Sequence, residues 1–209
     1  MRVETFVTGP FQENTYLVFD ESSNKAALVD PGDDAARLLS EIGKRRLELE
    51  AIWLTHAHVD HVGAVAAVHQ ATQVPIYLHP ADLPLYRNAS RQAALYSLSI
   101  TQPPEPDHEL AEGMTLTLGP AKWSVMHTPG HAPGHVVIYS VDVAFVGDCL
   151  FAGSIGRTDL PFSDPKLLLH SLSRIAALPQ RTRVLPGHGP ATTIGEELDS
   201  NPFLVGLNR

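Results

Sequence analysis

Residues 55–61 read THAHVDH, so three imidazoles and a carboxylate fall within a few positions. An apolar run typical of a buried strand, AIWLT at 51–55, precedes this stretch, and a predicted helix, VGAVAAVHQA at 62–71, follows it. His56 and His58 leave an extended backbone on the same side, while Asp60 and His61 open the helix and turn back toward that space. Imidazole and carboxylate are ligands of zinc and related divalent metals. The stretch therefore predicts a metal site at the end of a strand.

Three further candidate ligands lie downstream, each where a strand gives way to a loop rich in Gly and Pro. They are His131 in TPGHAPGH, Asp148 at the end of VAFVGD, and His188 in RVLPGHG. Catalytic groups are commonly held at such exits. The five histidines and two aspartates exceed the ligands of a single tetrahedral metal, whereas two metals sharing one bridging carboxylate account for them. Packed together without a cation, these donors would repel each other or lack partners.

Strand-like and helix-like segments alternate along the chain, and many of the strands are short and apolar. The expected strands are 3–8, 14–19, 26–30, 51–55, 74–79, 114–118, 123–128, 136–140, 143–148 and 183–189. The expected helices are 35–46, 62–71, a region within about 80–100 that begins at a proline, and 165–178. This interleaving predicts an α/β or α+β fold in which helices pack outside sheets. The length of 209 residues predicts a single domain over 1–209.

The composition predicts a globular protein of the cytoplasm. Apolar residues make up 44% of the chain and charged residues 18%, yet the apolar run VGAVAAV is too short to span a membrane. The start, MRVETFVTGPF, lacks the pattern of a secretory signal, and the single cysteine agrees with a reducing compartment. The net charge of −8 argues against a nucleic-acid partner. We therefore expect a small-molecule substrate and neither a membrane nor a nucleic-acid partner, and we leave the oligomeric state open.

The motifs THAHVDH, TPGH, GD and GHG, in this order, resemble the metallo-β-lactamase superfamily over essentially the whole chain. Within it, FAGSIGRTDLP at 151–161 and TTIGEELDSNPFL at 192–204 look like the short bacterial glyoxalase II type, the hydroxyacylglutathione hydrolases. The resemblance implies a four-layer αββα sandwich. It also implies that Asp148 bridges two metals, one bound by His56, His58 and His131, the other by Asp60, His61 and His188. Zinc is the expected metal, with iron or manganese as alternatives.

The resemblance implies hydrolysis of a thioester such as S-lactoylglutathione to D-lactate and a free thiol. Two divalent cations would lower the pKa of a bridging water and polarise the substrate carbonyl. Asp148 and Asp60 are the expected catalytic residues, the latter by orienting the hydroxide as well as binding metal. A thiolate leaves readily, so the reaction needs little help from a general acid.

Arg157, in the segment GRTDLP just after the Asp148 strand, is the expected substrate-binding residue. A guanidinium at the mouth of the site could bind a substrate carboxylate through two hydrogen bonds. The alternative is an internal ion pair between Arg157 and Asp159 that shapes the loop. Longer glyoxalase II enzymes have a Lys near this position, a Tyr two residues on, and a basic C-terminal helical region for glutathione. We expect this chain to lack these features.

Other functions remain open from the sequence. Persulfide dioxygenases resemble this pattern but use one iron, which His56, His131 and Asp148 would bind here. A lactonase of the same superfamily is a second alternative. A β-lactamase is disfavoured by Asp148 and the plain N-terminus, and a nuclease by the negative charge. A non-enzymatic metal protein would have the same ligands but no open coordination position. Seven ligands over two metals leave room for a substrate, which argues against this class.

The remaining candidates are expected to have ordinary roles. His69, His79, His108 and His170 have no motif around them and are expected to be surface or core residues. His127 and His135 are also expected to be ordinary surface or core residues. The alternative is that they contact the nearby ligand His131 and hold it in position. Asp30 in VDPG is expected in a turn, and Cys149 in the core.

Overall fold

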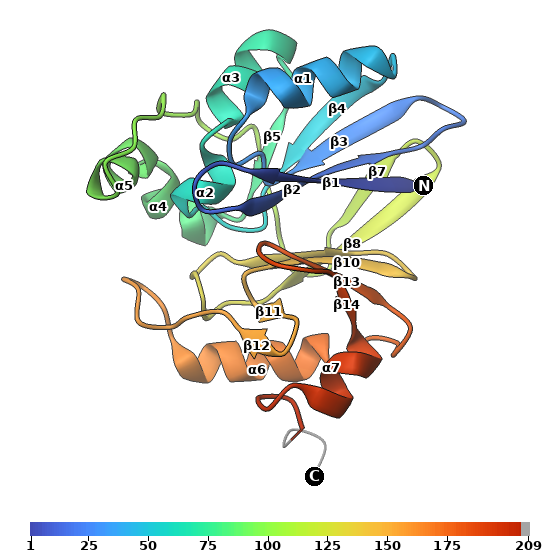
Figure 1. Cartoon of the computed structure of the whole chain (residues 1–209), viewed down its shortest axis with the longest axis vertical. Helices are drawn as coiled ribbons and strands as arrows, with labels where there is room; N and C mark the ends of the chain where they lie inside the picture. Colours follow the sequence, from blue (N-terminus) through green and yellow to red (C-terminus); the bar gives the residue numbers. More distant parts are fainter. Residues whose placement is uncertain (206–209) are drawn as a thin grey trace.

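The computed structural model describes residues 1–205, in which two sheets lie face to face with helices outside each of them (Figure 1). The first sheet has six strands in the order β1-β2-β3-β4-β5-β6. β1 to β3 pair antiparallel, and β3 to β6 pair parallel. The strand bounds are β1 Arg2–Thr8, β2 Glu13–Phe19, β3 Lys25–Val29, β4 Glu48–Trp53, β5 Ile76–Leu78 and β6 His108–Glu109.

The second sheet also has six strands, in the order β14-β13-β10-β9-β8-β7. Only β10 and β13 pair parallel; the other neighbours are antiparallel. The bounds are β7 Thr115–Leu118, β8 Ala121–His127, β9 Val136–Tyr139, β10 Val143–Gly147, β13 Arg183–Pro186 and β14 Thr192–Thr193. A separate hairpin consists of β11 Leu150–Phe151 and β12 Ser154–Ile155.

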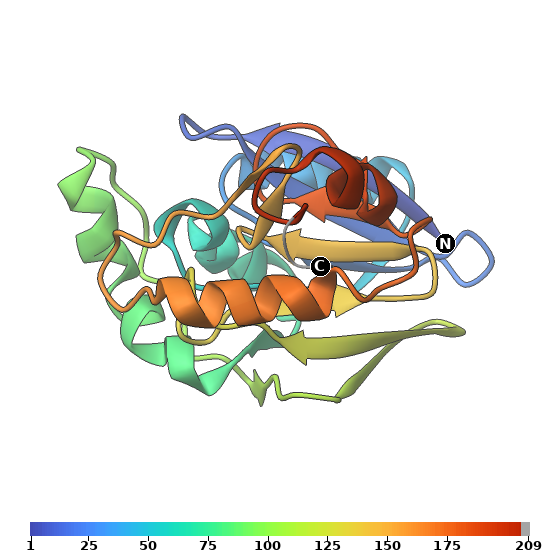
Figure 2. The ribbon, with the colours of Figure 1, turned by 90° about the horizontal axis from the view of Figure 1, so that it is seen from below.

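The helices form the two outer layers and one end of the molecule. α1 and α3 cover the outer face of the first sheet, and α6 and α7 lie on the outer face of the second (Figures 1 and 2). The remaining short helices cluster at one end of the first sheet (Figure 1). The bounds are α1 Ala35–Lys44, α2 Val59–Val62, α3 Val65–Thr72, η1 Pro80–Asp82, α4 Leu83–Tyr86, α5 Ala89–Leu95, α6 Pro165–Ile175 and α7 Ile194–Ser200.

Alternating side chains along the central strands explain the layers. In β2, Leu17 packs in the cluster that includes Leu38 of α1, whereas Val18 faces the cluster between the sheets. In β10, Phe145 joins that inter-sheet cluster, and Val146 points outward to the cluster formed with α6 and α7. Successive residues of a strand point to opposite faces, so strands that are apolar throughout must be covered on both sides. The predicted α/β class and four-layer αββα sandwich are confirmed.

Two of the predicted helices are divided into shorter ones. The helix expected at 62–71 is α2 and α3, separated at Gly63, where an added Cβ would lie 2.3 Å from the carbonyl oxygen of Gly32. The amide of Ala64 donates to the carbonyl of Pro31 at 3.0 Å, which ties this break to the end of β3. The region expected within 80–100 is η1, α4 and α5.

The sequence did not predict β6, β11, β12, β14 or α7. The single domain over 1–209 stays a prediction, and its last four residues lie outside those described. Among residues 1–205, no helix is long and apolar enough to cross a bilayer.

Candidate metal centre

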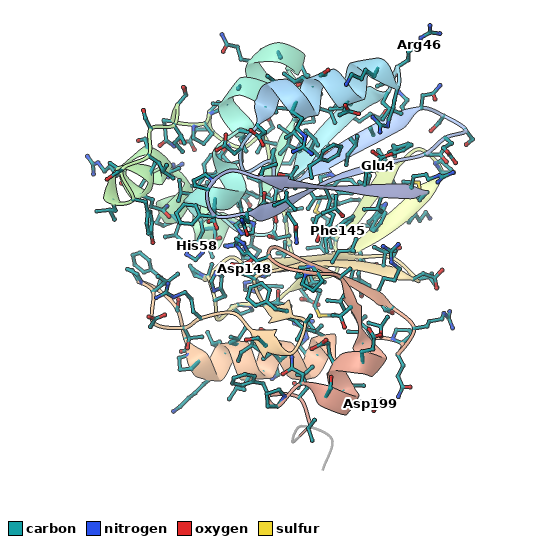
Figure 3. The ribbon with its side chains drawn as sticks, in the orientation of Figure 1. Glu4, Arg46, His58, Phe145, Asp148 and Asp199 are labelled. Atoms are coloured by element: carbon teal, nitrogen blue, oxygen red, sulfur yellow. The ribbon has the colours of Figure 1, made fainter. Side chains whose placement is uncertain are left out.

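The seven predicted ligands come from five segments at one end of the two sheets. His56 and His58 follow β4, and Asp60 and His61 lie in α2. The second sheet contributes the other three from loops after its strands, namely His131 after β8, Asp148 after β10 and His188 after β13. Figure 3 shows His58 and Asp148 close together where the two sheets face each other. The structure brings all seven side chains into one place, and their role as ligands stays a prediction.

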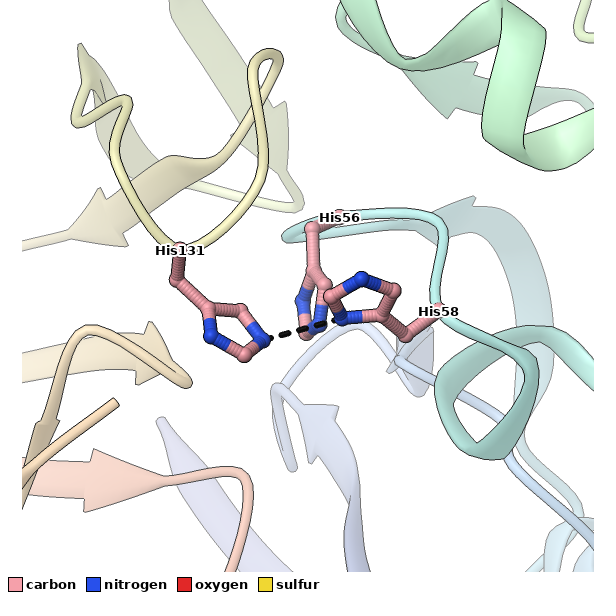
Figure 4. A group of neighbouring side chains, drawn as sticks. All are labelled: His56, His58 and His131. Atoms are coloured by element: carbon pink, nitrogen blue, oxygen red, sulfur yellow. Dashed lines mark hydrogen bonds between the residues drawn. The ribbon is translucent and has the colours of Figure 1, made fainter. Parts of the chain in front are cut away.

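Three imidazoles form the first group. The ligand atoms of His56, His58 and His131 all lie within 4.8 Å of one another. Nδ1 of His58 is 2.9 Å from Nε2 of His131 (Figure 4). A cation among these nitrogens would be bound by three lone pairs, which is the protein contribution to many catalytic zinc sites.

The second group consists of Asp60, His61 and His188, whose ligand atoms also lie within 4.8 Å of one another. Nε2 of His188 is 3.2 Å from Oδ2 of Asp60. Asp148 lies between the two groups. Its Oδ1 is 3.4 Å from Nε2 of His61, and its Oδ2 is 3.5 Å from Nε2 of His131. One carboxylate thus reaches both groups, as a bridging ligand must.

Hydrogen bonds behind the site determine which ring nitrogen of His56, His61 and His131 carries the proton. Nδ1 of His61 lies 3.1 Å from Oδ2 of Asp30, and Nδ1 of His131 lies 2.9 Å from the carbonyl oxygen of Arg157. Both acceptors lack a proton to give, so each histidine donates from Nδ1 and its Nε2 lone pair points into the site. Nδ1 of His56 is 3.1 Å from Oγ1 of Thr55, whose hydroxyl donates to Asp30, so His56 is oriented in the same way.

Buried polar atoms without partners show that the site fits cations. Within residues 1–205, Nε2 of His56, Nε2 of His61 and Oδ1 of Asp148 are buried and have no hydrogen-bond partner. Such atoms are costly unless something binds them. Gly187 leaves the space beside them open, since a Cβ there would lie 2.1 Å from Oδ1 of Asp148 and 2.6 Å from Cε1 of His61. The residues present therefore fit a dinuclear metal site.

Burial keeps the first group neutral. It lowers the pKa of His56 well below the usual value and that of His58 to about 4, with further lowering by neighbouring histidines. Burial also lowers the pKa of His131, against the opposing effect of Asp148. Neutral imidazole is the form that binds metal, so these rings are ready to do so at neutral pH.

The second group attracts positive charge. Burial alone would lower the pKa of His61, but the carboxylates of Asp148 and Asp60 raise it well above its usual value. Burial would raise the pKa of Asp148, but the charge and hydrogen bond of His61, together with the charges of His131 and His188, more than reverse this. These buried carboxylates around one imidazole therefore stabilise a cation among them, which a proton or a metal ion can supply.

Several buried residues that support the site were not identified from the sequence as doing so. Asp30 occupies the expected turn, with φ of 48°, but its carboxylate also accepts from Thr55 and His61. His135 is buried, and its Nε2 accepts from the amide of Asp148 at 3.1 Å, which matches the supporting alternative for this residue. Asp82 accepts from the amides of Ala57 and Gly134. Its position in an unremarkable ADLP stretch gave no signal.

Among the described residues, His79, His127 and Cys149 do not belong to either ligand group. The rings of His79 and His127 stack on each other at 4.0 Å. Cys149 is buried, and burial raises the pKa of its thiol to about 12, which agrees with a core role rather than a nucleophilic one.

A cleft of about 500 Å³ opens onto the two groups. Asp60, His131 and Asp148 line its floor, and Arg157 lies at its rim. Arg157 forms an ion pair with Asp159, in which Nε and Nη2 each donate to a carboxylate oxygen at 2.7 Å. The internal ion pair considered from the sequence is therefore present, and substrate binding by Arg157 stays a prediction.

The comparisons with known proteins agree with this geometry. The family described as the metallo-beta-lactamase superfamily matches residues 8–188. Among curated relatives, hydroxyacylglutathione hydrolase GloC of Haemophilus influenzae is 38% identical, and the match covers 98% of each chain.

Among solved structures, TTHA1623 in a di-iron-bound form is similar at 49% identity and a TM-score of 0.89, covering 96% of this chain and 100% of that one. The B3 metallo-β-lactamase BLEG-1 is similar at 42% identity and a TM-score of 0.89, covering 98% and 100%. ETHE1 from Myxococcus xanthus is similar at 27% identity and a TM-score of 0.81, covering 99% and 85%. With the motifs, the layered fold and the two ligand groups in agreement, the chain belongs to the metallo-β-lactamase superfamily.

Proposed function

We propose that the chain is a metal-dependent hydrolase of the glyoxalase II type that cleaves a small-molecule thioester, of which S-lactoylglutathione is an example. The observation that carries the proposal is the position of Asp148, whose carboxylate lies within 3.6 Å of ring nitrogens of both ligand groups. The similarity to GloC of Haemophilus influenzae supports the thioester class. We propose zinc as the metal and the cytoplasm as the location.

The protein's own residues would bind the reactants and hold the protons in place. Two divalent cations held by the seven ligands would supply a Lewis acid and lower the pKa of a bound water toward neutrality. Asp60 lines the cleft, and its pKa is lowered because the charges of His61 and His188 outweigh the effect of burial. Its carboxylate can therefore accept a hydrogen bond from a water and orient it at neutral pH. The thiol product has a pKa of about 8.5, so it can depart as a thiolate.

A persulfide dioxygenase is the second candidate, because His56, His131 and Asp148 all face the site and ETHE1 from Myxococcus xanthus shares the fold. Such an enzyme needs one iron. The full second group, in which Asp60, His61 and His188 come together, favours the dinuclear hydrolase.

Metal analysis of the purified protein combined with two assays tests the proposal. We expect two metal ions per chain and rapid hydrolysis of a thioester. One iron per chain, oxygen consumption with glutathione persulfide and no thioester hydrolysis would instead identify the dioxygenase. A chromogenic β-lactam should be a poor substrate; efficient cleavage of it, with no thioester turnover, would place the chain functionally with BLEG-1.

A further inference from the structure

Apolar side chains form one wall of the cleft above the ligand groups. Leu95 at the end of α5 is 83% exposed and Tyr96 next to it is 51% exposed. The ring of Tyr96 packs edge-on against Phe11 at 5.1 Å. All three residues line the cleft. This wall stays exposed in the free protein and can be covered by whatever enters the cleft.

The opposite wall belongs to the second half of the chain and is also apolar. Phe151, Ile155 and Leu160 line it. Outside the ligand groups, the uncharged polar groups among the lining residues of the described part of the chain are those of Gln92, Ser154 and the hydroxyl of Tyr96. The scissile bond of a substrate at the ligand groups would therefore have apolar surface on both sides of it.

Positive charge outside the ligand groups is sparse in this cleft. Within residues 1–205, Arg157 is the single Lys or Arg among the lining residues, and it already pairs with Asp159 through two hydrogen bonds of 2.7 Å. The side chains of this pair are 62% and 68% exposed, so their ion pair contributes little to stability. Their opposite charges nevertheless neutralise each other at the rim of the cleft. A glutathione moiety carries two carboxylates, and neither finds an unpaired cation here.

We infer that the cleft selects thioesters whose acyl group is an extended apolar chain and whose thiol is uncharged, with Asp159 disfavouring carboxylate-bearing thiols by neutralising Arg157. This inference rests on the proposed hydrolase function and narrows its substrate class, so that S-lactoylglutathione, the example given above, becomes a poor substrate. The reaction adds water across the carbonyl carbon–sulfur bond and yields a carboxylic acid and a thiol, so it needs no further reactant.

The test measures kcat/KM of the metal-loaded protein for thioesters of N-acetylcysteamine, an uncharged thiol, with acyl chains from acetyl to octanoyl. We expect kcat/KM to rise about threefold to fourfold for each added methylene until the wall is covered, which corresponds to ~0.8 kcal/mol per buried CH₂. The octanoyl thioester of glutathione should be a poorer substrate than that of N-acetylcysteamine, by about tenfold.

Three variants separate the two parts of the inference. Leu95→Ser should lower the octanoyl-to-acetyl ratio of kcat/KM about threefold, whereas Leu167→Ser, on an exposed part of α6 that does not line the cleft, should leave this ratio unchanged. Asp159→Asn leaves Arg157 without its charged partner. In this variant, the ratio of kcat/KM for the glutathione thioester to that for the N-acetylcysteamine thioester should rise about fivefold, the size expected for one exposed ion pair.

The outcomes distinguish this inference from the function on which it rests. Hydrolysis with no dependence on chain length, or with glutathione preferred over the uncharged thiol, would overturn the inference and leave the hydrolase standing. Failure of the metal-loaded protein to cleave any of these thioesters would overturn both.

Discussion

Asp148 is the residue on which the two ligand groups depend, because its carboxylate lies close to ring nitrogens of both groups. We predict that Asp148→Ala lowers kcat/KM by at least two decades while the protein still folds, since the alanine removes the bridge without adding bulk. Thioester hydrolysis and circular dichroism check this prediction. Asp142→Ala is the control, because Asp142 is an exposed aspartate whose partner is Arg181. A loss smaller than two decades for Asp148→Ala would contradict a bridging role.

Asp30 acts through His61 rather than on a substrate. Its Oδ2 accepts from Nδ1 of His61, and its Oδ1 accepts from the amide of Thr55 at 2.7 Å. Asn tolerates the positive φ of this position but offers one acceptor oxygen in place of two. We predict that Asp30→Asn weakens metal binding about tenfold to a hundredfold, as measured by competition with a chelator.

Asp34→Asn is the matched control for this substitution. Asp34 also has a positive φ, of 56°, but it is exposed, and Arg37 is its ion-pair partner. Equal metal affinity of the two variants would show that the contact between Asp30 and His61 does not orient a ligand.

The difference between the seven predicted ligands and Asp30 shows what a sequence can reveal about single residues. Four of the ligands occur in the dense motif THAHVDH, and the other three stand at strand ends in the motifs TPGH, GD and GHG, whose order along the chain resembles the superfamily. Asp30 and Asp82 instead act through partners that are 25 positions or more away, since Asp30 contacts Thr55 and Asp82 contacts Ala57 and Gly134. Such partners depend on the tertiary fold, so spacing along the chain could not identify them.

At the scale of elements, Gly130 determines how closely the His131 loop packs on α6. Its φ is 139°, and an added Cβ would lie 2.2 Å from the amide nitrogen of Leu168. We predict that Gly130→Ala destabilises the protein by about 2–4 kcal/mol, because both the backbone conformation and the contact become strained. Urea unfolding measures this change.

Gly43 offers a control in which the same substitution has the opposite sign. It lies in α1, and a Cβ added there meets nothing within 4 Å. Gly43→Ala should stabilise the protein by up to about 1 kcal/mol, because alanine has the higher helix propensity. If Gly130→Ala were equally harmless, the loop would not be packed as tightly as its contacts indicate.

Elements with a strong periodic pattern were predicted, and those that depend on contacts were not. The apolar strands and the amphipathic α1 and α6 follow from their own residues. The helix at 62–71 divides because Gly63 passes close to Gly32, which no local pattern reveals. β6 is only two residues long and pairs with β5, so its existence depends on its neighbour rather than on its own sequence.

At the scale of the whole molecule, helices packed outside sheets were predictable because many strands are apolar throughout, and the four-layer order followed from the resemblance to the superfamily. The buried side chain that ties the two halves together at the site was not predicted. Asp82 is buried and makes this connection, since it accepts from Ala57 N–H in the loop after β4 and from Gly134 N–H in the loop after β8. One carboxylate thus ties together the loops that carry His56, His58 and His131.

The position of Asp82 leads to a prediction about the pH dependence of stability. Burial raises its pKa to about 6, although the two amide hydrogen bonds oppose this. In the unfolded chain the pKa is about 3.9, so between these values the folded protein binds more protons than the unfolded one. The contribution of Asp82 to the free energy of unfolding should therefore increase as the pH falls from about 6.5 to about 4.5, by ~2 kcal/mol. Asp82→Asn does not titrate, so this contribution should be absent from the variant. Urea unfolding of both proteins across this window, with the variant's free energy subtracted from that of the wild type, isolates the effect from the titration of other groups. A difference that stays constant with pH would mean that Asp82 keeps an ordinary pKa and that the two loops are not joined through a buried carboxyl group.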